Sequence, residues 1–264
     1  AKLKEQSAIQ DLALTTNGVL LARHAEQLAA AGLDRVTVSL DTLDPETFQL
    51  LTRRNDLARV LKGVEAARGA GLGRGLKIDT VVIRGVNDAQ LTDLLRYGRE
   101  IEAEVRFIEY MDVGGATRWS MDRVVSRREM LAAIAAESGE PEPIPPNDTA
   151  EQWAPADGYR LPDGTRFGII SSTTQPFCGT CDRSRLTADG RWFTCLYARD
   201  GEDLRGLIRG GMDEAALTRH LKARWSMRRD RGAEQRLAMR QRDALADPET
   251  LRQDPHLEMH TRGG

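Results

Sequence analysis

Three cysteines are the residues of this sequence best suited to chemistry. They follow the spacing C-x2-C-x13-C, at Cys178, Cys181 and Cys195. Two thiols three residues apart can bind one metal centre from a single turn, and the chain must bring the third one back. An odd number of cysteines crowded into 18 positions is a poor disulfide framework. The spacing therefore indicates a metal-binding or iron–sulfur site.

Three thiols leave the kind of metal centre open. A structural zinc site normally has four ligands, and none of the four histidines lies close to the cysteines in the sequence. An iron–sulfur cluster usually has four thiolate ligands, so a cluster on three cysteines would leave one iron open to a substrate atom. Three inert buried thiols are the third interpretation, and the C-x2-C pair argues against it.

The segment between Cys181 and Cys195 predicts how the third cysteine returns. It reads as two short strands, residues 184–187 and 191–196. The Asp-Gly pair at 189–190 is a typical hairpin turn. We therefore expect a β-hairpin that carries Cys195 back toward the first two cysteines.

The register of this hairpin decides which side chains share a face. A three-residue loop with Gly190 in the left-handed region places Cys195 opposite Arg183. Because side chains alternate along a strand, Arg183 and Arg185 lie on one face and Cys181 joins them. Cys195 then shares that face. A two-residue loop would place Cys195 on the other face, so the prediction depends on the turn type.

Arg183 and Arg185 suggest a phosphate ligand. Guanidinium groups bind phosphate oxygens through two parallel hydrogen bonds. Beside a metal centre with an open position, the two arginines would hold a polyphosphate while the metal holds another part of the same molecule. The alternative is that they are exposed strand residues in surface ion pairs.

The elements that must position these residues alternate between strand and helix. The predicted strands are residues 12–16, 35–40, 77–83, 105–110 and 166–171, and the predicted helices are residues 19–31, 56–70 and about 88–100. Such alternation favours a parallel sheet, either open or part of a (β/α) barrel. The strand ends read TTNG, SLD, VIRG and EYMD. Because ligands bind at the C-terminal ends of such strands, these residues are a candidate rim, although turns alone would also explain them.

Smaller signals refine this pattern. Asp44 and Pro45 are typical of a helix N-cap and first turn. Helices are also predicted at residues 202–209 and 213–225, and the charged residues 228–242 are predicted as a solvated surface or a mobile tail. A glycine-rich stretch, GAGLGRG, leads from helix into strand and contains no complete G-x-G-x-x-G, which excludes a dinucleotide-binding motif.

The distribution of proline along the sequence predicts that the chain has three parts. Six of the ten prolines lie within residues 138–164, which indicates a connecting segment. We therefore expect an α/β region over residues 1–137, a Pro-rich connection over 138–164, and a cysteine-bearing region over 165–264.

The overall balance of residues limits the partners. The net charge of −2 disfavours a general nucleic-acid binder. No apolar run reaches the 18 to 20 residues or so that cross a bilayer, and the first residues do not form a signal peptide. We expect a protein of a reducing, cytoplasmic compartment, without nucleic-acid or membrane partners.

The cysteine–arginine segment resembles a known family. The stretch FCGTCDRSRLTADGRWFTCL, residues 177–196, is similar to the C-terminal cluster motif of the GTP 3′,8-cyclase family. These are radical S-adenosylmethionine (SAM) enzymes that begin molybdenum cofactor biosynthesis. Similar segments follow the family in order: LTTNG (14–18), VSLD (38–41), LKIDTVVIRGVND (76–88), RFIEYMDVGG (106–115) and the terminal Gly263 and Gly264. The resemblance spans essentially the whole chain.

The resemblance implies a fold and a set of site residues. The fold would be an incomplete (β/α) barrel of the radical SAM type, containing the later strands only, followed by a C-terminal extension that carries an iron–sulfur cluster. The implied residues are the 4Fe–4S ligands Cys178, Cys181 and Cys195; the GTP contacts Thr15, Lys77, Arg183, Ser184 and Arg185; the SAM contacts Ser39 and Met111; and an active-site tail of Gly263 and Gly264.

The resemblance also implies an activity. It is the radical SAM-dependent conversion of GTP to (8S)-3′,8-cyclo-7,8-dihydroguanosine 5′-triphosphate, a lyase reaction of molybdopterin biosynthesis. The implied cofactors are the 4Fe–4S cluster and SAM, and the implied partners are GTP and a reductant, with a homodimer left open.

One motif of the family is missing from this sequence. The family holds a first, SAM-cleaving 4Fe–4S cluster on C-x3-C-x2-C, and all three cysteines here belong to the other motif. We therefore expect an N-terminally truncated chain that binds ligands but does not start radical chemistry alone. Two alternatives stay open: a zinc-stapled, non-catalytic binding module, and another radical SAM enzyme with a second cluster.

Overall fold

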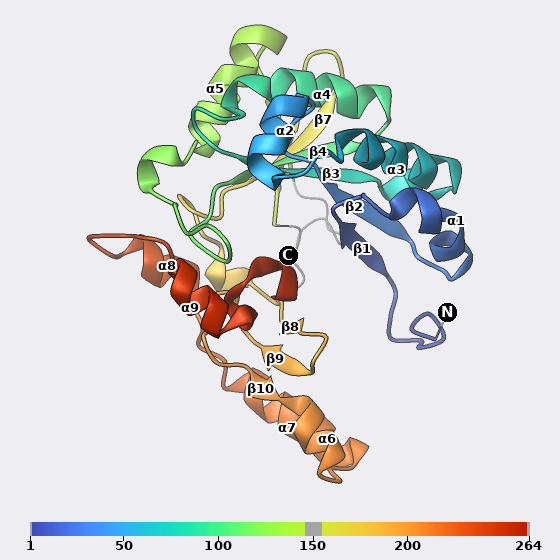
Figure 1. Ribbon diagram of the computed structural model, residues 1–264, viewed down its shortest axis with the longest axis vertical. Coiled ribbons are helices and arrows are strands. Elements are labelled where there is room, and N and C mark those ends of the chain that lie inside the picture. The colour runs from blue at the N-terminus through green and yellow to red at the C-terminus, as the bar shows by residue number, and fades with distance from the viewer. Residues whose placement is uncertain (1, 146–154, 263–264) are drawn as a thin grey trace. The chain divides into compact units, whose positions relative to one another are not determined.

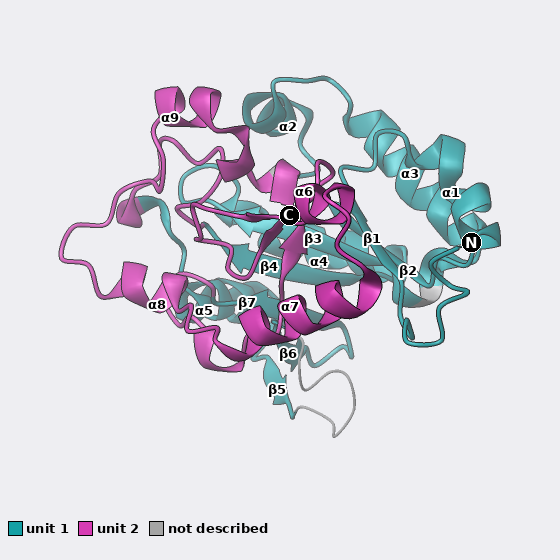
Figure 2. Cartoon of the chain, turned by 90° about the horizontal axis from the view of Figure 1, so that it is seen from below, with its two compact units in different colours: residues 1–110, 123–171 teal, residues 111–122, 172–264 magenta. Residues whose placement is uncertain are grey.

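The chain forms two compact units. The structure, a computed structural model, describes residues 2–145 and 155–262. Unit 1 comprises residues 1–110 and 123–171, and unit 2 comprises residues 111–122 and 172–264 (Figure 2). No helix in the described part of the chain is both long enough and apolar enough to cross a bilayer.

Unit 1 is a seven-stranded sheet with helices, and it confirms the predicted parallel α/β pattern. Its strands are β1 (Ala13–Thr16), β2 (Arg35–Ser39), β3 (Lys77–Val82), β4 (Glu104–Glu109), β5 (Glu142–Ile144), β6 (Asp157–Arg160) and β7 (Arg166–Ile170). Its α-helices are α1 (Leu21–Ala30), α2 (Pro45–Thr52), α3 (Leu57–Gly69), α4 (Leu91–Glu100) and α5 (Arg127–Ser138). The order across the sheet is β1-β2-β3-β4-β7-β6-β5, with β1 to β4 and β7 parallel to one another.

Alternating side chains give the parallel strands one apolar and one polar face. In β3, Ile78, Thr80 and Val82 are buried, whereas the alternate residues Lys77 and Asp79 are only half-buried. The apolar face packs against α1, α3 and α4, and the hydrophobic core of unit 1 lies between them (Figure 1). The polar face is therefore the one left for ligands.

Local signals fix the ends and the packing of the helices. The predicted N-cap is confirmed, because Asp44 accepts a hydrogen bond of 2.7 Å from the backbone N–H of Thr47, with Pro45 in the first turn. Helices α1 and α3 approach closely at Gly63. A Cβ atom there would collide with the carbonyl oxygen of Gly18.

The Pro-rich segment differs from the predicted connection. Residues 138–164 contain β5 and β6, and β6 pairs antiparallel with β7. Strand β7, which the sequence placed with the cysteine-bearing part, pairs in parallel with β4. Strand β5 tolerates Pro143 because it is the outermost strand, where a missing N–H costs no ladder hydrogen bond. The functional division at residues 137 and 164 stays a prediction.

Unit 2 is built from short elements. They are the strands β8 (Arg185–Leu186), β9 (Arg191–Phe193) and β10 (Glu202–Asp203) and the helices α6 (Leu204–Arg209), α7 (Glu214–Ser226), α8 (Gly232–Leu237) and α9 (Pro248–Gln253). The strands form one antiparallel sheet in the order β10-β9-β8. The helix predicted from residue 202 begins at Leu204, because the two preceding residues pair with β9.

The charged stretch 228–242 is not a mobile tail. The other predicted possibility, a solvated surface, holds for most of its residues, which are exposed, but not for Arg236 and Arg242. The stretch contains α8, and these two arginines bind Asp112, whose side chain is fully buried. Arg236 Nε donates to Asp112 at 2.7 Å, and Arg242 donates to both carboxylate oxygens at 2.9 and 2.8 Å. The hydroxyl of Tyr197 adds a fourth hydrogen bond of 2.9 Å. A buried carboxylate is stable only with such partners, which explains why these arginines are not solvated.

Candidate functional site

The predicted hairpin carries the cysteines, and its register is confirmed. Arg185 pairs with Phe193 in the antiparallel ladder, a register that places residue 195 opposite residue 183. The loop has three residues, and Gly190 lies in the left-handed region at φ +89°. Strand β9 ends at Phe193, however, so Cys195 lies in the bend that follows rather than in a strand, contrary to the predicted range.

The hairpin separates the site residues by face. Cys181, Arg183 and Arg185 are half-buried, whereas Asp182 and Ser184 between them are exposed. This alternation confirms the shared face of the two arginines and Cys181. Ser184, between the two arginines, is exposed, and its part as a GTP contact stays a prediction.

The start of α8 touches both parts of the cysteine motif. A Cβ atom on Gly232 would lie 3.1 Å from the Sγ of Cys195. The neighbouring Arg231 lies beside the turn of the first two cysteines, since its Nη2 would be 3.6 Å from a Cβ atom on Gly179. The tertiary structure thus gathers the C-x2-C turn and the third cysteine around one short segment. A side chain at position 232 would collide first with the Cβ atom of Tyr197, at 2.5 Å, and would also crowd the sulfur.

Arginines surround the thiols. Arg183 Nη2 lies 3.6 Å from the Sγ of Cys181, and Arg228 donates to the carbonyl oxygen of the same residue. The charge of Arg185 interacts with both Cys181 and Cys195. Burial raises the pKa of the Cys181 thiol, but hydrogen bonds from Arg228 and Arg183 outweigh it and lower that pKa below its usual value. This setting favours a thiolate, the form that binds metals.

The donor set fits a cluster of several irons. All three cysteines are free and half-buried, as cluster ligands must be. Within the described residues, no three or more His, Cys, Asp or Glu side chains come together around the position of one metal ion. In a 4Fe–4S cluster each thiolate binds a different iron, and a shell of arginines would balance the negative charge of the thiolates.

Unit 1 gathers the other predicted contacts on the polar face of its sheet. Thr15 pairs with Thr37 of β2, which in turn pairs with Lys77 of β3, so these residues form one row. Ser39 lies two residues further along β2 and therefore points to the same face. Thr15 and Ser39 are exposed and Lys77 is half-buried, which leaves all three accessible.

Three charged residues on this face were not predicted. Asp79 pairs with Ser39 across the strands, and Arg106 pairs with Asp79. Glu104 forms ion pairs with two of these residues. One of its carboxylate oxygens lies 2.9 Å from Arg106 Nε and 3.5 Å from Lys77 Nζ. The alternation of polar residues in KIDTVV and EVRFIE was the signal that could have found them.

Two effects make the polar face electrostatically unusual. Burial and the positive charge of Arg106 lower the pKa of Lys77. Burial raises the pKa of Asp79, although Arg106 and Lys77 oppose the shift. The Oδ1 atom of Asp79 is buried and accepts no hydrogen bond from any described residue. A bound hydroxyl or ammonium group would satisfy it.

The remaining predicted residues are placed as follows. Met111 is half-buried in unit 2 and directly precedes the buried Asp112. Gly263 and Gly264 lie outside the described residues.

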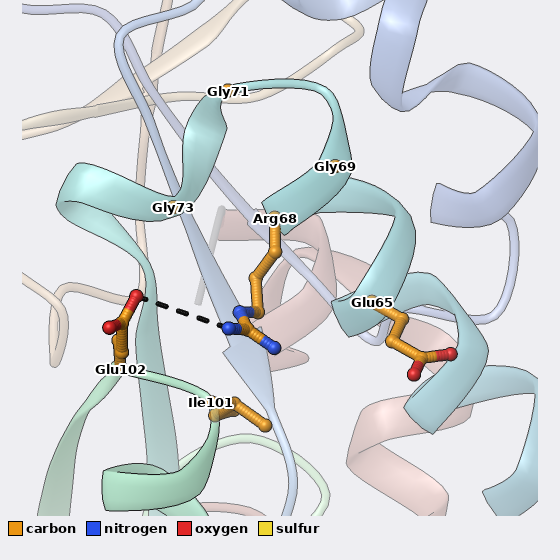
Figure 3. A pocket seen from close by; sticks show the side chains of 7 residues that line it. All are labelled: Glu65, Arg68, Gly69, Gly71, Gly73, Ile101 and Glu102. Carbon is orange, nitrogen blue, oxygen red and sulfur yellow. Dashed lines mark ion pairs between the residues drawn. The ribbon is translucent and has the colours of Figure 1, made fainter.

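A hollow in unit 1 lies at the other end of the strands. Its lining includes Gly71, Ile101 and an ion pair of 3.9 Å between Arg68 and Glu102 (Figure 3). These residues precede β3 and β4 rather than follow them. Ligands of parallel sheets bind beyond the C-terminal ends of the strands, so the hollow is not a candidate site.

Comparison with known proteins decides the family. The sequence matches the Molybdenum Cofactor Synthesis C family over residues 103–234 and the Radical SAM superfamily over residues 1–98. A GTP 3′,8-cyclase 1 of Mycobacterium tuberculosis is 53% identical over the whole chain, which covers 72% of that protein. The chain belongs to the GTP 3′,8-cyclase family.

Other members of the GTP 3′,8-cyclase family agree. A GTP 3′,8-cyclase 3 of Mycobacterium bovis is 53% identical over the whole chain, which covers 68% of its length. A GTP 3′,8-cyclase of Staphylococcus aureus is 40% identical over 90% of the chain and 69% of its own length. The resemblance found in the sequence is thereby confirmed.

Proposed function

We propose that this chain supplies the substrate-binding part of a GTP 3′,8-cyclase. Cys178, Cys181 and Cys195 would hold a 4Fe–4S cluster with one open iron. GTP would bind with its purine at that iron and its phosphates on Arg183 and Arg185. The observation that carries the proposal is the half-buried face shared by two arginines and Cys181 beside a third thiol.

The polar face of unit 1 carries the other proposed ligand contacts. We propose that the sheet of unit 1 is the incomplete barrel of the radical SAM type, with Thr15 and Lys77 as GTP contacts and Ser39 as a SAM contact. Met111, which belongs to unit 2, is the other proposed SAM contact. The chemistry that SAM and its cluster supply to the family is a 5′-deoxyadenosyl radical, which removes a hydrogen atom from the GTP ribose so that the ribose carbon bonds to C8 of guanine. The residues of this chain would hold those two atoms together, which is catalysis by orientation.

The cluster is tested by anaerobic reconstitution of the chain with iron and sulfide. We expect iron–sulfur absorption with about four irons per chain. Cys195→Ser should lose it. Binding of zinc alone, without iron–sulfur absorption, would instead support the zinc-stapled binding module and overturn the proposal.

The phosphate contacts are tested by titrating GTP against reconstituted variants. Arg183→Ala and Arg185→Ala should each weaken binding at least tenfold, because one charge-assisted hydrogen bond contributes about 1.5–3 kcal/mol. Arg224→Ala, which removes an exposed arginine of the same unit, is the matched control and should bind as the wild type does. Ser184→Ala should weaken binding less than either arginine variant, since it removes a neutral hydroxyl rather than a charged hydrogen-bond donor. Unchanged affinity in both arginine variants would contradict a phosphate role and favour another substrate.

A further inference from the structure

Arg262 is a buried arginine beside the cysteine motif. Only 3% of it is exposed. Its guanidinium lies 4.2 Å above the ring centroid of Phe193, and its Nη1 donates to the carbonyl oxygen of Leu196 at 2.5 Å. Its Nε donates to the carbonyl oxygen of His256. These contacts fix the guanidinium against β9 and the bend that carries Cys195.

The charge of Arg262 lacks an anionic partner. Among the described residues, no carboxylate forms an ion pair with it, and its Nη2 is buried without a hydrogen-bond acceptor. Arg228, on the other side of the motif, makes an instructive contrast. It also donates to a carbonyl oxygen of the motif, that of Cys181, and its Nε is likewise buried without a hydrogen bond. The difference is that the carboxylate of Asp230 lies 3.6 Å from this Nε. A buried cation without a counter-ion is costly, so the position of Arg262 calls for an anionic ligand.

The surroundings of Arg262 indicate which anion this is. The carbonyl that it binds belongs to the residue after Cys195, and its charge interacts with the thiol of Cys195. Burial lowers the pKa of Arg262, while the charges of Asp254 and Cys195 oppose that shift. Asp254 acts on the guanidinium more strongly than Cys195 does but makes no ion pair with it, and Cys195 is the thiol of the motif whose charge reaches it. Sulfur atoms of a thiolate-bound cluster accept N–H hydrogen bonds, and such bonds set its reduction potential.

We propose that Arg262 donates its free Nη2–H to a sulfur of the cluster held on Cys195 and raises the reduction potential of that cluster. The proposal rests on the proposed function, because it requires the cluster. It assigns Arg262 a tuning role, not a catalytic one. No step of the reaction passes through it.

The test is the midpoint potential of the reconstituted cluster, followed by absorption and by the EPR signal of the reduced form. Arg262→Gln removes the charge. Arg262→Met removes it as well, but keeps an apolar side chain against the ring of Phe193. Both should make one-electron reduction about tenfold less favourable, a shift of about 59 mV to lower potential. Arg262→Lys, which keeps the charge, should fall between these variants and the wild type. Arg224→Gln is the control for loss of a distant positive charge and should leave the potential unchanged.

Each outcome decides the question. A wild-type midpoint potential in both Arg262→Gln and Arg262→Met would overturn the proposal. A loss of GTP affinity without a shift in potential would also overturn it, because Arg262 would then be a phosphate contact. Loss of the cluster in these two variants but not in Arg262→Lys would support the charge role, whereas loss in all three would contradict it. A wild-type chain that takes up no iron refutes the proposed function itself, and a loaded wild type with unshifted variants refutes only this inference.

Discussion

The two units of the chain are stabilised in different ways. Unit 1 has a continuous hydrophobic core between its sheet and its helices. Among the described residues of unit 2, one small apolar cluster consists of Ala246, Leu251 and Leu257, and Val113, Trp119, Phe193 and Leu204 are buried outside it. Unit 2 depends instead on buried charged groups, with Asp112 at the centre of one network and arginines around the thiols. A region with little apolar core commonly depends on a bound metal or cluster for stability, which agrees with the proposed ligand.

The substitution with the largest expected effect removes the centre of the charged network of unit 2. Asp112→Ala leaves the buried charges of Arg236 and Arg242 without their carboxylate, although each keeps a hydrogen bond to a backbone carbonyl oxygen, and should destabilise unit 2 by about 3–5 kcal/mol. Trp119, Trp192 and Trp225 all belong to unit 2, so tryptophan fluorescence in a Trp153→Phe background reports its unfolding in urea.

The matched control is an exposed aspartate with an arginine partner in unit 1. Asp93→Ala removes an ion pair whose side chains are 56% and 61% exposed, and should change stability by less than about 1 kcal/mol. Equal effects of the two substitutions would show that unit 2 does not depend on its charged network.

Lowering the pH should also remove part of the stability that Asp112 gives to unit 2. The loss should be no larger than the loss caused by Asp112→Ala. Burial raises the pKa of Asp112, but Arg242 and Arg236 outweigh it and hold that pKa below its ordinary value. A carboxylate with a lowered pKa stabilises the folded state above the unfolded-state pKa of about 3.9, and this contribution is lost as the pH falls through the folded-state value.

Urea unfolding of unit 2 between pH 7 and pH 3 measures this effect. The wild type should lose stability below about pH 4. Asp112→Asn, which cannot titrate, should lack that part of the decline. Identical profiles for the two proteins would exclude Asp112 as its source.

The smallest expected effect tests the packed core of unit 1. Gly63→Ala should destabilise the protein by about 1–3 kcal/mol, because the new Cβ atom meets the backbone of Gly18 where α1 and α3 cross. Gly69→Ala, at the end of the same helix, has no atom within 4 Å of the new Cβ and should stabilise by about 0.5–1 kcal/mol. Thermal unfolding followed by far-UV circular dichroism compares them. Stabilisation by both substitutions would show that α1 and α3 are not in close contact at Gly63.

Regular elements were predictable where the pattern is local. The strand–helix alternation of unit 1, the cap at Asp44 and the hairpin at Gly190 depend on neighbouring residues, and the structure confirms them. The strands within the Pro-rich segment were missed because an edge strand accepts proline, so the composition of a linker and of an edge strand can be the same. The charged stretch was misread because the partner of its arginines, Asp112, lies more than a hundred residues earlier.

The sequence by itself determined the family and the three thiols, because C-x2-C-x13-C with two arginines in a β-hairpin is a local pattern whose geometry depends on alternation and one turn. Only the tertiary structure decided what surrounds those thiols. Gly232 beside Cys195, Arg228 beside Cys181 and the unpaired Arg262 come from distant parts of the chain, and packing alone brings them to the motif. The physical reason is that the cost of burying a charge depends on whether a partner lies beside it in the folded chain. The local sequence around the charged residue does not contain that information.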